Sequence, residues 1–389
     1  MIRVLFVGGY RPFKYRRRGG PNAVSSPLID AFALKAPREF QITVLSTPFR
    51  ELAIPILKPL TIKLRGKIVL KYMPLLSALP LIMREVAKTH VVHVFAGGEP
   101  LSVLIQLISR ILGKKTVVTF HSYDPIEFYY ERMSLPILAR KLREVLYRLS
   151  LKYATLIIFT SNFVRVKIQV SGLLTSETSR YVIVPNGTDL RPMYETKSKD
   201  EIVILSIVGN FPYRKGLDIL FRVLEKLIGR LQEHQVKRRI RIVIVGKVPK
   251  DLQQLLGKLA CTVQVCVLHG IPREELLKLY AGSHICVQLS RAEGFLLPAL
   301  EAASQGCAVI ISNRTGVAEV LRGAAIIVNI KDLEEVVSCI QRLLTDDKFR
   351  EEIGRKCYLR SRAFTYDKVA ARYLKCYVDV LKAKLQRGE

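Results

Sequence analysis

The stretch Ser290-Arg-Ala-Glu-Gly-Phe-Leu-Leu-Pro-Ala-Leu-Glu-Ala302 follows a short apolar run and leads into a predicted helix. The apolar run, Ile285 to Leu289, is typical of a buried strand. Pro298 suits the first turn of a helix, where a missing N–H costs nothing. The order strand, loop, helix predicts a unit of a parallel α/β sheet.

The loop between this strand and this helix has the chemistry of a ligand site. A helix start carries unpaired N–H groups and about half a positive charge, which suits a phosphate. Carboxylates on either side, from Glu293 and Glu301, suit hydroxyl groups. A sugar nucleotide matches both features, but a surface helix with an acidic first turn explains the same residues. The backbone N–H groups expected at the helix start belong to Gly294, Phe295, Leu296 and Leu297.

Strand-like and helical segments alternate on both sides of this stretch. In the first half the strand-like runs are 40–48, Val91–Phe95 and Thr116–Phe120. A second alternation begins at Glu201, after a polar segment that starts at the turn signal Pro185-Asn-Gly187. We therefore predict an α/β protein with two Rossmann-like parallel-sheet domains, which would face a central cleft.

The charge of the chain is unusual. The 389 residues carry a formal net charge of +29. Residues 1–190 hold 28 Lys and Arg against 11 Asp and Glu, so the first half is both basic and poor in acids. Such a field attracts nucleic acid, an anionic membrane surface or phosphorylated substrates. We expect no nucleic-acid partner, because no nucleic-acid-binding motif is found and few aromatics are interleaved with the basic clusters.

The seven cysteines all fall in the second half of the chain, and none forms a Cys-x-x-Cys pair. Their odd number and their apolar surroundings predict buried thiols of a cytosolic protein. The most apolar region, Ile68 to Met83, is interrupted by Lys71, Pro74 and Pro80 and is too short for a membrane span.

The segment from Ser134 to Ser150 is predicted to be an amphipathic helix. A basic amphipathic helix of this kind can lie on an anionic membrane. A helix that packs its apolar face on the core and exposes its basic side has the same pattern, and we favour that interpretation. The apolar face comprises Leu135, Leu138, Leu142, Val145 and Leu149.

Two further positions in the first half suggest a ligand. Gly19 and Gly20 lie between a predicted opening strand, Met1 to Gly8, and a predicted helix, an arrangement that binds phosphate in doubly wound sheets. The spacing is neither Gly-x-Gly-x-x-Gly nor a P-loop, so it does not support dinucleotide or ATP binding. His121 directly follows a strand, where parallel sheets bind ligands, although a lone histidine is more often structural.

Several motifs together resemble the retaining family 4 glycosyltransferases (glycosyl transferases group 1), which have the GT-B fold. The resemblance is close over residues 180–325 and looser in the first half. The motifs are Val184-Pro-Asn-Gly-Thr-Asp189, Val208-Gly-Asn-Phe-Pro-Tyr-Arg-Lys-Gly-Leu-Asp218, Glu293-Gly-Phe-Leu-Leu-Pro-Ala-Leu-Glu301 and Thr315-Gly-Val-Ala-Glu319.

The resemblance implies a transfer of sugar from a nucleoside-diphosphate-sugar (NDP-sugar) by a metal-independent hexosyltransferase. Lys215 would neutralise the diphosphate, Gly209 would allow close approach of its loop, and Glu301 would bind the ribose. Glu293 would bind a sugar hydroxyl, and the backbone of Phe295 to Leu297 would meet the phosphates or sugar.

Other implied roles fall on residues outside these motifs. Gly20 would lie near the diphosphate, His121 near the transferred sugar and the acceptor, and the segment after Gly270 near the base. The resemblance also implies three parts of the chain: an acceptor-side domain (residues 1–190), a donor-binding domain (191–365), and a last helix (366–389) that crosses back to the first domain.

Two positions depart from the family pattern. Asn210 stands where the family usually has arginine, and Arg214, beside Lys215, is a candidate replacement. Leu296 stands where the family usually has glycine. The chain lacks a convincing Asp-x-Asp site, so neither a metal nor another cofactor is expected.

Our leading hypothesis is a cytoplasmic transferase that acts on a lipid-linked, glycolipid or polysaccharide acceptor, with the basic first domain as a candidate for peripheral binding to the inner membrane face. The competing hypotheses are a non-enzymatic polyanion-binding protein on a degenerate GT-B fold and another GT-B nucleotide-sugar enzyme.

Overall fold

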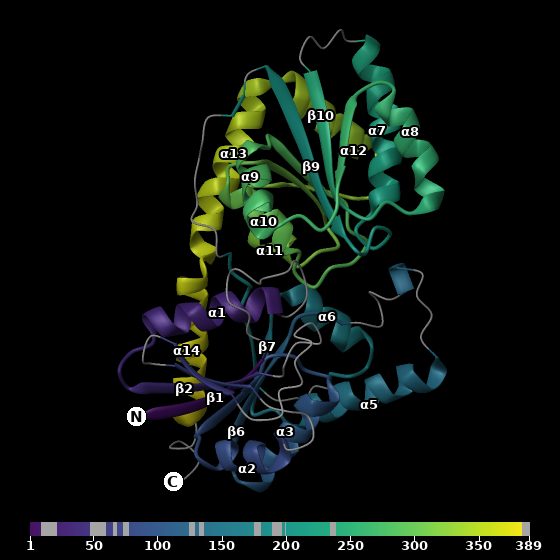
Figure 1. Cartoon of the computed structure of the whole chain (residues 1–389). Helices are drawn as coiled ribbons and strands as arrows, with labels where there is room; N and C mark the ends of the chain where they lie inside the picture. The colour runs from purple at the N-terminus through teal and green to yellow at the C-terminus, as the bar shows by residue number, and fades with distance from the viewer. Residues whose placement is uncertain are drawn as a thin grey trace. The chain divides into compact units, whose positions relative to one another are not determined.

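A computed structural model describes residues 1–8, 22–46, 60–64, 68–72, 78–123, 129–131, 136–174, 180–188, 197–198, 200–233 and 239–382. The chain forms two compact units, each with its own sheet (Figure 1). Unit 1 comprises Met1–Tyr123, Leu135–Gly187 and Tyr366–Glu389, and unit 2 comprises Asp124–Ser134 and Thr188–Thr365.

Within the described residues, unit 1 contains an eight-stranded sheet in the order β3-β4-β2-β1-β5-β6-β7-β8. All neighbouring strands are parallel except β3 and β4, which form an antiparallel pair at the edge. The strands are β1 (Ile2–Val7), β2 (Phe40–Ser46), β3 (Leu60–Leu64), β4 (Ile68–Tyr72), β5 (Val91–Val94), β6 (Lys115–Phe120), β7 (Leu156–Phe159) and β8 (Tyr181–Ile183).

Successive side chains along the central strands pack on opposite faces of this sheet, as the two-residue period of a strand requires. Leu5 packs with the helices α2 and α3, whereas the ring of Phe6 contacts that of Phe32 on α1. Helices α2, α3 and α5 cover one face, and α1 and α14 cover the other (Figure 1). The helices of unit 1 are α1 (Asn22–Lys35), α2 (Ala78–Ala87), α3 (Pro100–Ile111), α5 (Ile137–Tyr153), α6 (Asn162–Val170) and α14 (Tyr366–Lys382).

Helix α14, the last described element of the chain, is held in unit 1 by a buried polar cluster. The ring nitrogens of His93 on β5 lie 2.7 Å from the Tyr377 hydroxyl and 2.8 Å from the Thr119 hydroxyl. The ring of Tyr373 stacks on His93 at a centroid distance of 5.4 Å. Because the cluster is buried and both imidazole nitrogens are bonded, it specifies how α14 docks on the sheet.

Helix α5 corrects the interpretation that we favoured for the amphipathic segment. Its buried residues are Tyr147, Ser150 and Leu151. Most of the predicted apolar face is not on the core: Leu138, Leu142 and Val145 are exposed, and Leu149 is half-buried. Val145 precedes Tyr147 by two residues, or about 200° around the helix, so the apolar stripe points away from the sheet. Leu135, which we assigned to the same face, lies outside the described residues.

Unit 2 contains, in its described part, a six-stranded parallel sheet in the order β11-β10-β9-β12-β13-β14. The strands are β9 (Glu201–Gly209), β10 (Arg239–Gly246), β11 (Gln264–Leu268), β12 (Ile285–Gln288), β13 (Ala308–Ser312) and β14 (Ile326–Val328). The helices are α7 (Leu217–Glu233), α8 (Gln253–Ala260), α9 (Arg273–Gly282), α10 (Leu297–Ser304), α11 (Val317–Val320), α12 (Leu333–Thr345) and α13 (Asp347–Ser361).

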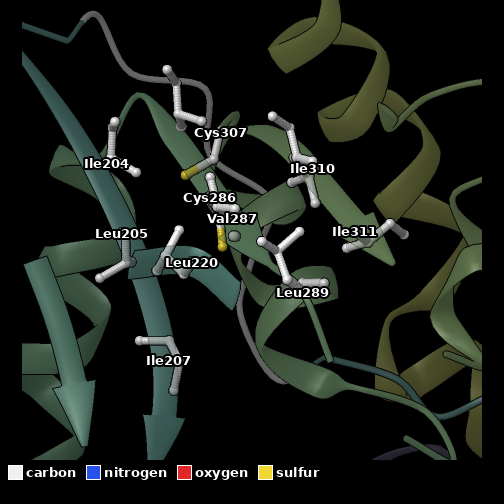
Figure 2. Close-up of a cluster of buried hydrophobic side chains, with 14 of the residues drawn as sticks. Ile204, Leu205, Ile207, Leu220, Cys286, Val287, Leu289, Cys307, Ile310 and Ile311 are labelled. Atoms are coloured by element: carbon white, nitrogen blue, oxygen red, sulfur yellow. The ribbon is translucent and has the colours of Figure 1, made fainter. Parts of the chain in front are cut away.

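The core of unit 2 packs on the central strands β9, β12 and β13, which are buried over nearly their whole length. Figure 2 shows Cys286 and Cys307 among the aliphatic side chains of this core. All seven cysteines are free thiols, and four of them are buried. The prediction of buried thiols is wrong for Cys261, which is exposed, and for Cys266 and Cys339, which are half-buried.

The predicted α/β class with two parallel-sheet domains is confirmed. None of the helices in the described ranges is both long and apolar enough to cross a membrane.

We predict that acid weakens unit 1 through His93. Burial lowers the pKa of His93 from 6.5 to about 3. Between pH 6.5 and pH 3 the His93 side chain is protonated in the unfolded chain but neutral in the folded chain. The free energy of unfolding therefore falls as the pH drops from about 6.5 toward 3. The slope from this residue approaches about 1.4 kcal/mol per pH unit.

Urea unfolding of the wild type and of His93→Gln, measured between about pH 4.5 and 7.5, tests this prediction. Glutamine can bond to both hydroxyls and does not titrate, so the variant should show the shallower slope. His121, whose pKa burial also lowers, is present in both proteins and cancels. Equal slopes would contradict the prediction.

Candidate functional site

The loops after β9 and β12 meet at one edge of the unit 2 sheet. These two strands are neighbours, and the chain order reverses between them: β10 and β11 extend the sheet on one side, β13 and β14 on the other. In parallel α/β sheets, ligands bind outside the carboxyl ends of the strands at this switch point. The loop after β9 carries Arg214 and Lys215, and the loop after β12 carries Glu293.

Glu293 binds both cations of the neighbouring loop. Its Oε1 lies 2.8 Å from Lys215 Nζ and 3.3 Å from Arg214 Nε. The three side chains are almost buried, with exposed fractions of 11–12%. The guanidinium of Arg214 also lies over the ring of Phe211, 4.3 Å from its centroid. The structure therefore brings Lys215, Arg214 and Glu293 together.

The charge of this cluster favours an anion. Burial alone would raise the pKa of Glu293, but the charges of Lys215 and Arg214 outweigh it and hold the pKa below its ordinary value. The carboxylate is therefore ionised at neutral pH, and two cations against one anion leave a net charge of +1. Within the residues that the structure describes, no three His, Cys, Asp or Glu side chains form a potential metal site.

A second ion pair joins the loop after β12 to the first turn of α7, which follows the Lys215 loop. Arg291 donates two hydrogen bonds of 2.7 Å to the carboxylate of Asp218 and another to the carbonyl of Tyr213. A bidentate arginine–carboxylate pair fixes orientation as well as distance. Gly216 allows the close contact: its φ is +72°, and a Cβ there would lie 2.1 Å from the Leu289 carbonyl oxygen.

The Thr315-Gly-Val-Ala-Glu319 motif supports the backbone of the Glu293 loop. Glu293 forms a parallel bridge with Thr315. The Gly316 N–H donates to the Glu293 carbonyl at 3.1 Å, and the Val317 N–H donates to the Phe295 carbonyl at 2.8 Å. These bonds fix the path of the chain from Glu293, through Gly294, to the start of α10.

Leu296 precedes α10 in a left-handed conformation, with φ of 77°. No other non-glycine residue among those described has a positive φ. Such a conformation is costly for a residue with a Cβ and persists only where the surroundings impose it. Here the side chain is 2% exposed and belongs to the core, while the next residue, Leu297, is the first of the helix.

Glu301, in the middle of α10, is buried and has partners on α9. Its carboxylate accepts hydrogen bonds from the Arg273 guanidinium and, at 2.8 Å, from the Tyr280 hydroxyl. The ion-pair partner of Glu301 is thus Arg273 rather than a cation of the Lys215 loop. Our sequence analysis named neither Arg273 nor Tyr280, although both follow Gly270, where we placed the base-binding segment.

The glycines that we predicted to lie near the donor fall in different parts of the chain. Gly209 ends β9 with φ of 57°, and its backbone is so close to Gly246 that a Cβ on Gly246 would lie 2.3 Å from the Gly209 nitrogen. Gly270 lies in the turn after β11, with φ of 68°. Gly19 and Gly20 lie outside the described residues.

His121 belongs to unit 1, where it follows β6. Its Nε2 donates to the Phe95 carbonyl at 3.0 Å, which places the ring proton on this nitrogen. Burial lowers the pKa of His121 from 6.5 to about 4, so the ring is neutral at physiological pH. Its Nδ1 is buried and has no hydrogen-bond partner among the described residues. The Nδ1 of the neutral ring therefore remains able to accept a hydrogen bond, for example from a hydroxyl group.

A short segment from the first half of the sequence belongs to unit 2. The Glu131 carboxylate accepts a hydrogen bond of 2.9 Å from the Arg214 N–H. The Tyr130 hydroxyl accepts one of 2.6 Å from Arg314, two residues before the Gly316 contact. Sequence reasoning missed this segment because the strand and helix periods of the chain carry no sign of it.

Two family models match the chain. The model described as Glycosyltransferase Family 4 matches residues 31–192, and the model described as Glycosyl transferases group 1 matches residues 191–360. Together they span residues 31–360, which include parts of both units and every described residue of the Lys215 and Glu293 loops.

Individual proteins match at lower identity. A phosphatidylinositol N-acetylglucosaminyltransferase component from Arabidopsis thaliana is 26% identical over 43% of this chain and 37% of its own length. For this relative and for six further curated ones, the aligned region spans half of their length or less. An N,N'-diacetylbacillosaminyl-diphospho-undecaprenol alpha-1,3-N-acetylgalactosaminyltransferase from Campylobacter jejuni is 27% identical over 66% of this chain and 68% of its own.

Solved structures support the architecture. The alpha,alpha-trehalose 6-phosphate synthase from Burkholderia multivorans matches with a TM-score of 0.72 and 15% identity, over 100% of this chain and 99% of the other. At this identity the likeness shows the fold alone.

We predict that Leu296 tolerates glycine better than alanine. Both substitutions remove the buried side chain, but only alanine keeps the left-handed cost of about 1 kcal/mol. Leu296→Gly should therefore be more stable than Leu296→Ala by about that amount.

Leu300 is the matched control, because it is equally buried but lies inside α10. In a helix interior glycine is worse than alanine by about 1 kcal/mol, so the order should reverse there. Chemical denaturation of the four variants gives both differences. The same order at both positions would rule out strain at Leu296.

Proposed function

The chain belongs to the family 4 glycosyltransferases, and we propose that it is a retaining hexosyltransferase that moves a sugar from an NDP-sugar to a lipid-linked, glycolipid or polysaccharide acceptor. The proposal depends chiefly on one observation: two cations bound to one buried carboxylate, at the switch point of the unit 2 sheet. This arrangement suits a diphosphate that gains negative charge as its bond to the sugar breaks.

In this proposal, Lys215 and Arg214 bind the diphosphate of the donor. Glu293 holds both cations in position before the donor arrives, so that little reorganisation is needed at the moment of transfer. The start of α10 adds backbone N–H donors and the positive end of a helix dipole. Because the leaving group is stabilised by these fixed charges, we propose that no metal ion is required.

Carboxylates on α10 and before it would bind the neutral parts of the donor. An ionised carboxylate has about four acceptor positions. Arg273 and Tyr280 occupy two of those of Glu301, and we propose that ribose hydroxyls occupy others. Glu293 would accept from a hydroxyl of the transferred sugar. The acceptor hydroxyl attacks on the face from which the diphosphate departs and passes its proton to the departing phosphate, so the anomeric configuration is retained without an enzyme nucleophile.

We place His121 on the acceptor side of the reaction. Its open Nδ1 suits a hydrogen bond from a sugar hydroxyl, and its neutral form suits orientation rather than strong proton abstraction. The acceptor class is taken from relatives whose names include a phosphatidylinositol and an undecaprenyl diphosphate. For an acceptor of this kind, we propose that the enzyme works at the cytoplasmic face of a membrane.

We predict that Lys215→Ala lowers kcat/KM by about 100- to 1,000-fold, the usual effect of removing one preorganised charge partner of a leaving group. Sugar transfer from UDP-, GDP- and ADP-hexoses to short-chain lipid diphosphate acceptors is the measurement. NMR of the product should show the anomeric configuration of the donor, and EDTA should leave the rate unchanged.

Lys226→Ala is the matched control for this experiment. Lys226 also pairs with a glutamate, Glu334, but half of its side chain is exposed, and it lies on α7, more than two helical turns beyond the Lys215 loop. Its loss should change kcat/KM by less than about twofold. Full activity of Lys215→Ala would refute the site, and saturable donor binding without transfer would favour the non-enzymatic alternative.

We predict that activity does not fall with the protonation of a histidine of ordinary pKa. Because the pKa of His121 is lowered to about 4, the ring stays neutral and accepting down to that pH. The profile of kcat/KM between about pH 4.5 and 8 should lack an acidic limb centred near 6.5. His121→Phe should lose activity by about tenfold or more, and His121→Asn, which keeps an acceptor, should lose less. An acidic limb near 6.5 that disappears in His121→Asn would contradict the assignment.

A further inference from the structure

Three neighbouring helices of unit 1 expose large apolar side chains on their outer side. On α5 the exposed fractions reach 79% for Leu138 and 56% for Leu142, and on α3 the fraction is 75% for Ile111. Helix α3 packs against both α2 and α5, so the three helices form one continuous face, here named the α2–α3–α5 face (Figure 1). Its exposed apolar residues are Leu79, Met83, Leu104, Leu107, Ile111, Ile137, Leu138, Leu142 and Val145.

The apolar stripes have helical spacing and point away from the sheet. On α5, Leu138, Leu142 and Val145 repeat at intervals of four and three residues, opposite the buried Tyr147. On α3, Leu104 and Leu107 are exposed between buried neighbours. Monomeric proteins rarely expose a continuous apolar surface that crosses several elements, and such a surface marks an interaction site.

Basic residues accompany these stripes. Helix α5 carries five basic residues and one acidic residue, and that acid, Glu144, pairs with Arg148 at 3.0 Å. On the helical projection Lys141, Arg148 and Lys152 border the apolar stripe on one side. Arg110, near the end of α3, lies over the ring of Tyr153 at the end of α5 and so adds a cation between the two helices.

We propose that the α2–α3–α5 face binds an anionic lipid bilayer, with the apolar side chains in the headgroup–acyl boundary and the basic ones against lipid phosphates. The charge of this half of the chain favours a bilayer over a second copy of the protein as the partner of this face. Residues 1–190 hold 28 Lys and Arg against 11 Asp and Glu, so a second copy of the chain would meet repulsion, whereas an anionic surface attracts this half. An apolar stripe with basic borders is the pattern of a helix that lies in a membrane interface.

This inference deepens the proposed function, on which it rests only for the nature of the acceptor. It names the surface that would hold the enzyme at a membrane that carries the acceptor. The surface lies on a different unit from the Lys215–Glu293 cluster, so binding to lipid can be tested without donor, acceptor or turnover.

The test is co-sedimentation of the full chain with vesicles of phosphatidylcholine containing about one third phosphatidylglycerol. The wild type should bind these vesicles, bind pure phosphatidylcholine much less, and detach between about 0.05 and 0.5 M NaCl. Leu138→Gln/Leu142→Gln should weaken the partition coefficient at least tenfold. Both positions are exposed, so the variant should keep the melting temperature of the wild type.

Leu34→Gln/Leu359→Gln is the matched control. These leucines have similar exposures of 47% and 50%, but they lie on α1, which covers the opposite face of the unit 1 sheet, and on α13 of unit 2. The control should bind vesicles like the wild type. Equal binding by both double variants, or no binding by the wild type, would overturn the proposal. So would a change from dimer to monomer in Leu138→Gln/Leu142→Gln by light scattering, which would show that the face pairs two copies.

Sugar transfer to a water-soluble acceptor separates this proposal from the proposed function. The Leu138→Gln/Leu142→Gln variant should transfer at the wild-type rate in solution. Vesicle binding without transfer to any acceptor would support the proposed lipid-binding face and contradict the proposed transferase function.

Discussion

The proposed donor site depends on a balance between the burial of Glu293 and the attraction of its two cations. A carboxylate at this depth loses most of its hydration, which by itself would favour the protonated form. Lys215 and Arg214 reverse that preference. Removal of Glu293 would leave two nearly buried like charges without their shared partner, so the carboxylate holds both cations in place. The net charge of +1 then remains available to a ligand.

The backbone around this cluster is fixed by contacts of other kinds. Arg291 and Asp218 join the loop after β12 to the first turn of α7 through side chains, whereas the bridge from Glu293 to Thr315 uses main-chain bonds. Preorganisation of this kind matters for catalysis, since a loop that had to order itself around the donor would lose part of the binding free energy to entropy. The need for a fixed backbone also explains the left-handed Leu296. Glycine would adopt this conformation at lower cost, but the buried side chain of leucine is held by the core and so fixes the direction in which α10 begins.

The sequence predicts much of the fold because buried parallel strands are continuous apolar runs that are easily told from the helices between them. Our sequence analysis did not predict the antiparallel edge pair β3–β4, although the length of its connection indicates the direction. Only three residues separate these strands, too few for a parallel crossover. For α5 the spacing predicted an apolar stripe, which the structure shows at Leu138, Leu142 and Val145. Amphipathicity does not say whether such a stripe meets the core or something outside the chain, and so the favoured interpretation was wrong.

At the candidate site, too, the sequence predicted some residues but not the contacts that depend on tertiary packing. The family resemblance pointed to Lys215, and the order of strand, loop and helix pointed to Glu293. The structure shows that both residues lie in loops that follow the neighbouring strands β9 and β12. Sequence reasoning could not point to Arg273 as the partner of Glu301, since that pair depends on how α9 packs beside α10.

Glu131 is the clearest case of a residue that the sequence could not assign to the site. It is 83 residues from Arg214 in the chain and lies outside every periodic segment, yet its carboxylate binds the backbone of the residue next to Lys215. A carboxylate so close to a site that prefers anions is costly unless its position serves the loop, and burial raises its pKa. Through this hydrogen bond Glu131 holds the backbone of Arg214 in place, and it connects the segment that follows His121 in the sequence to the loop that holds the cations.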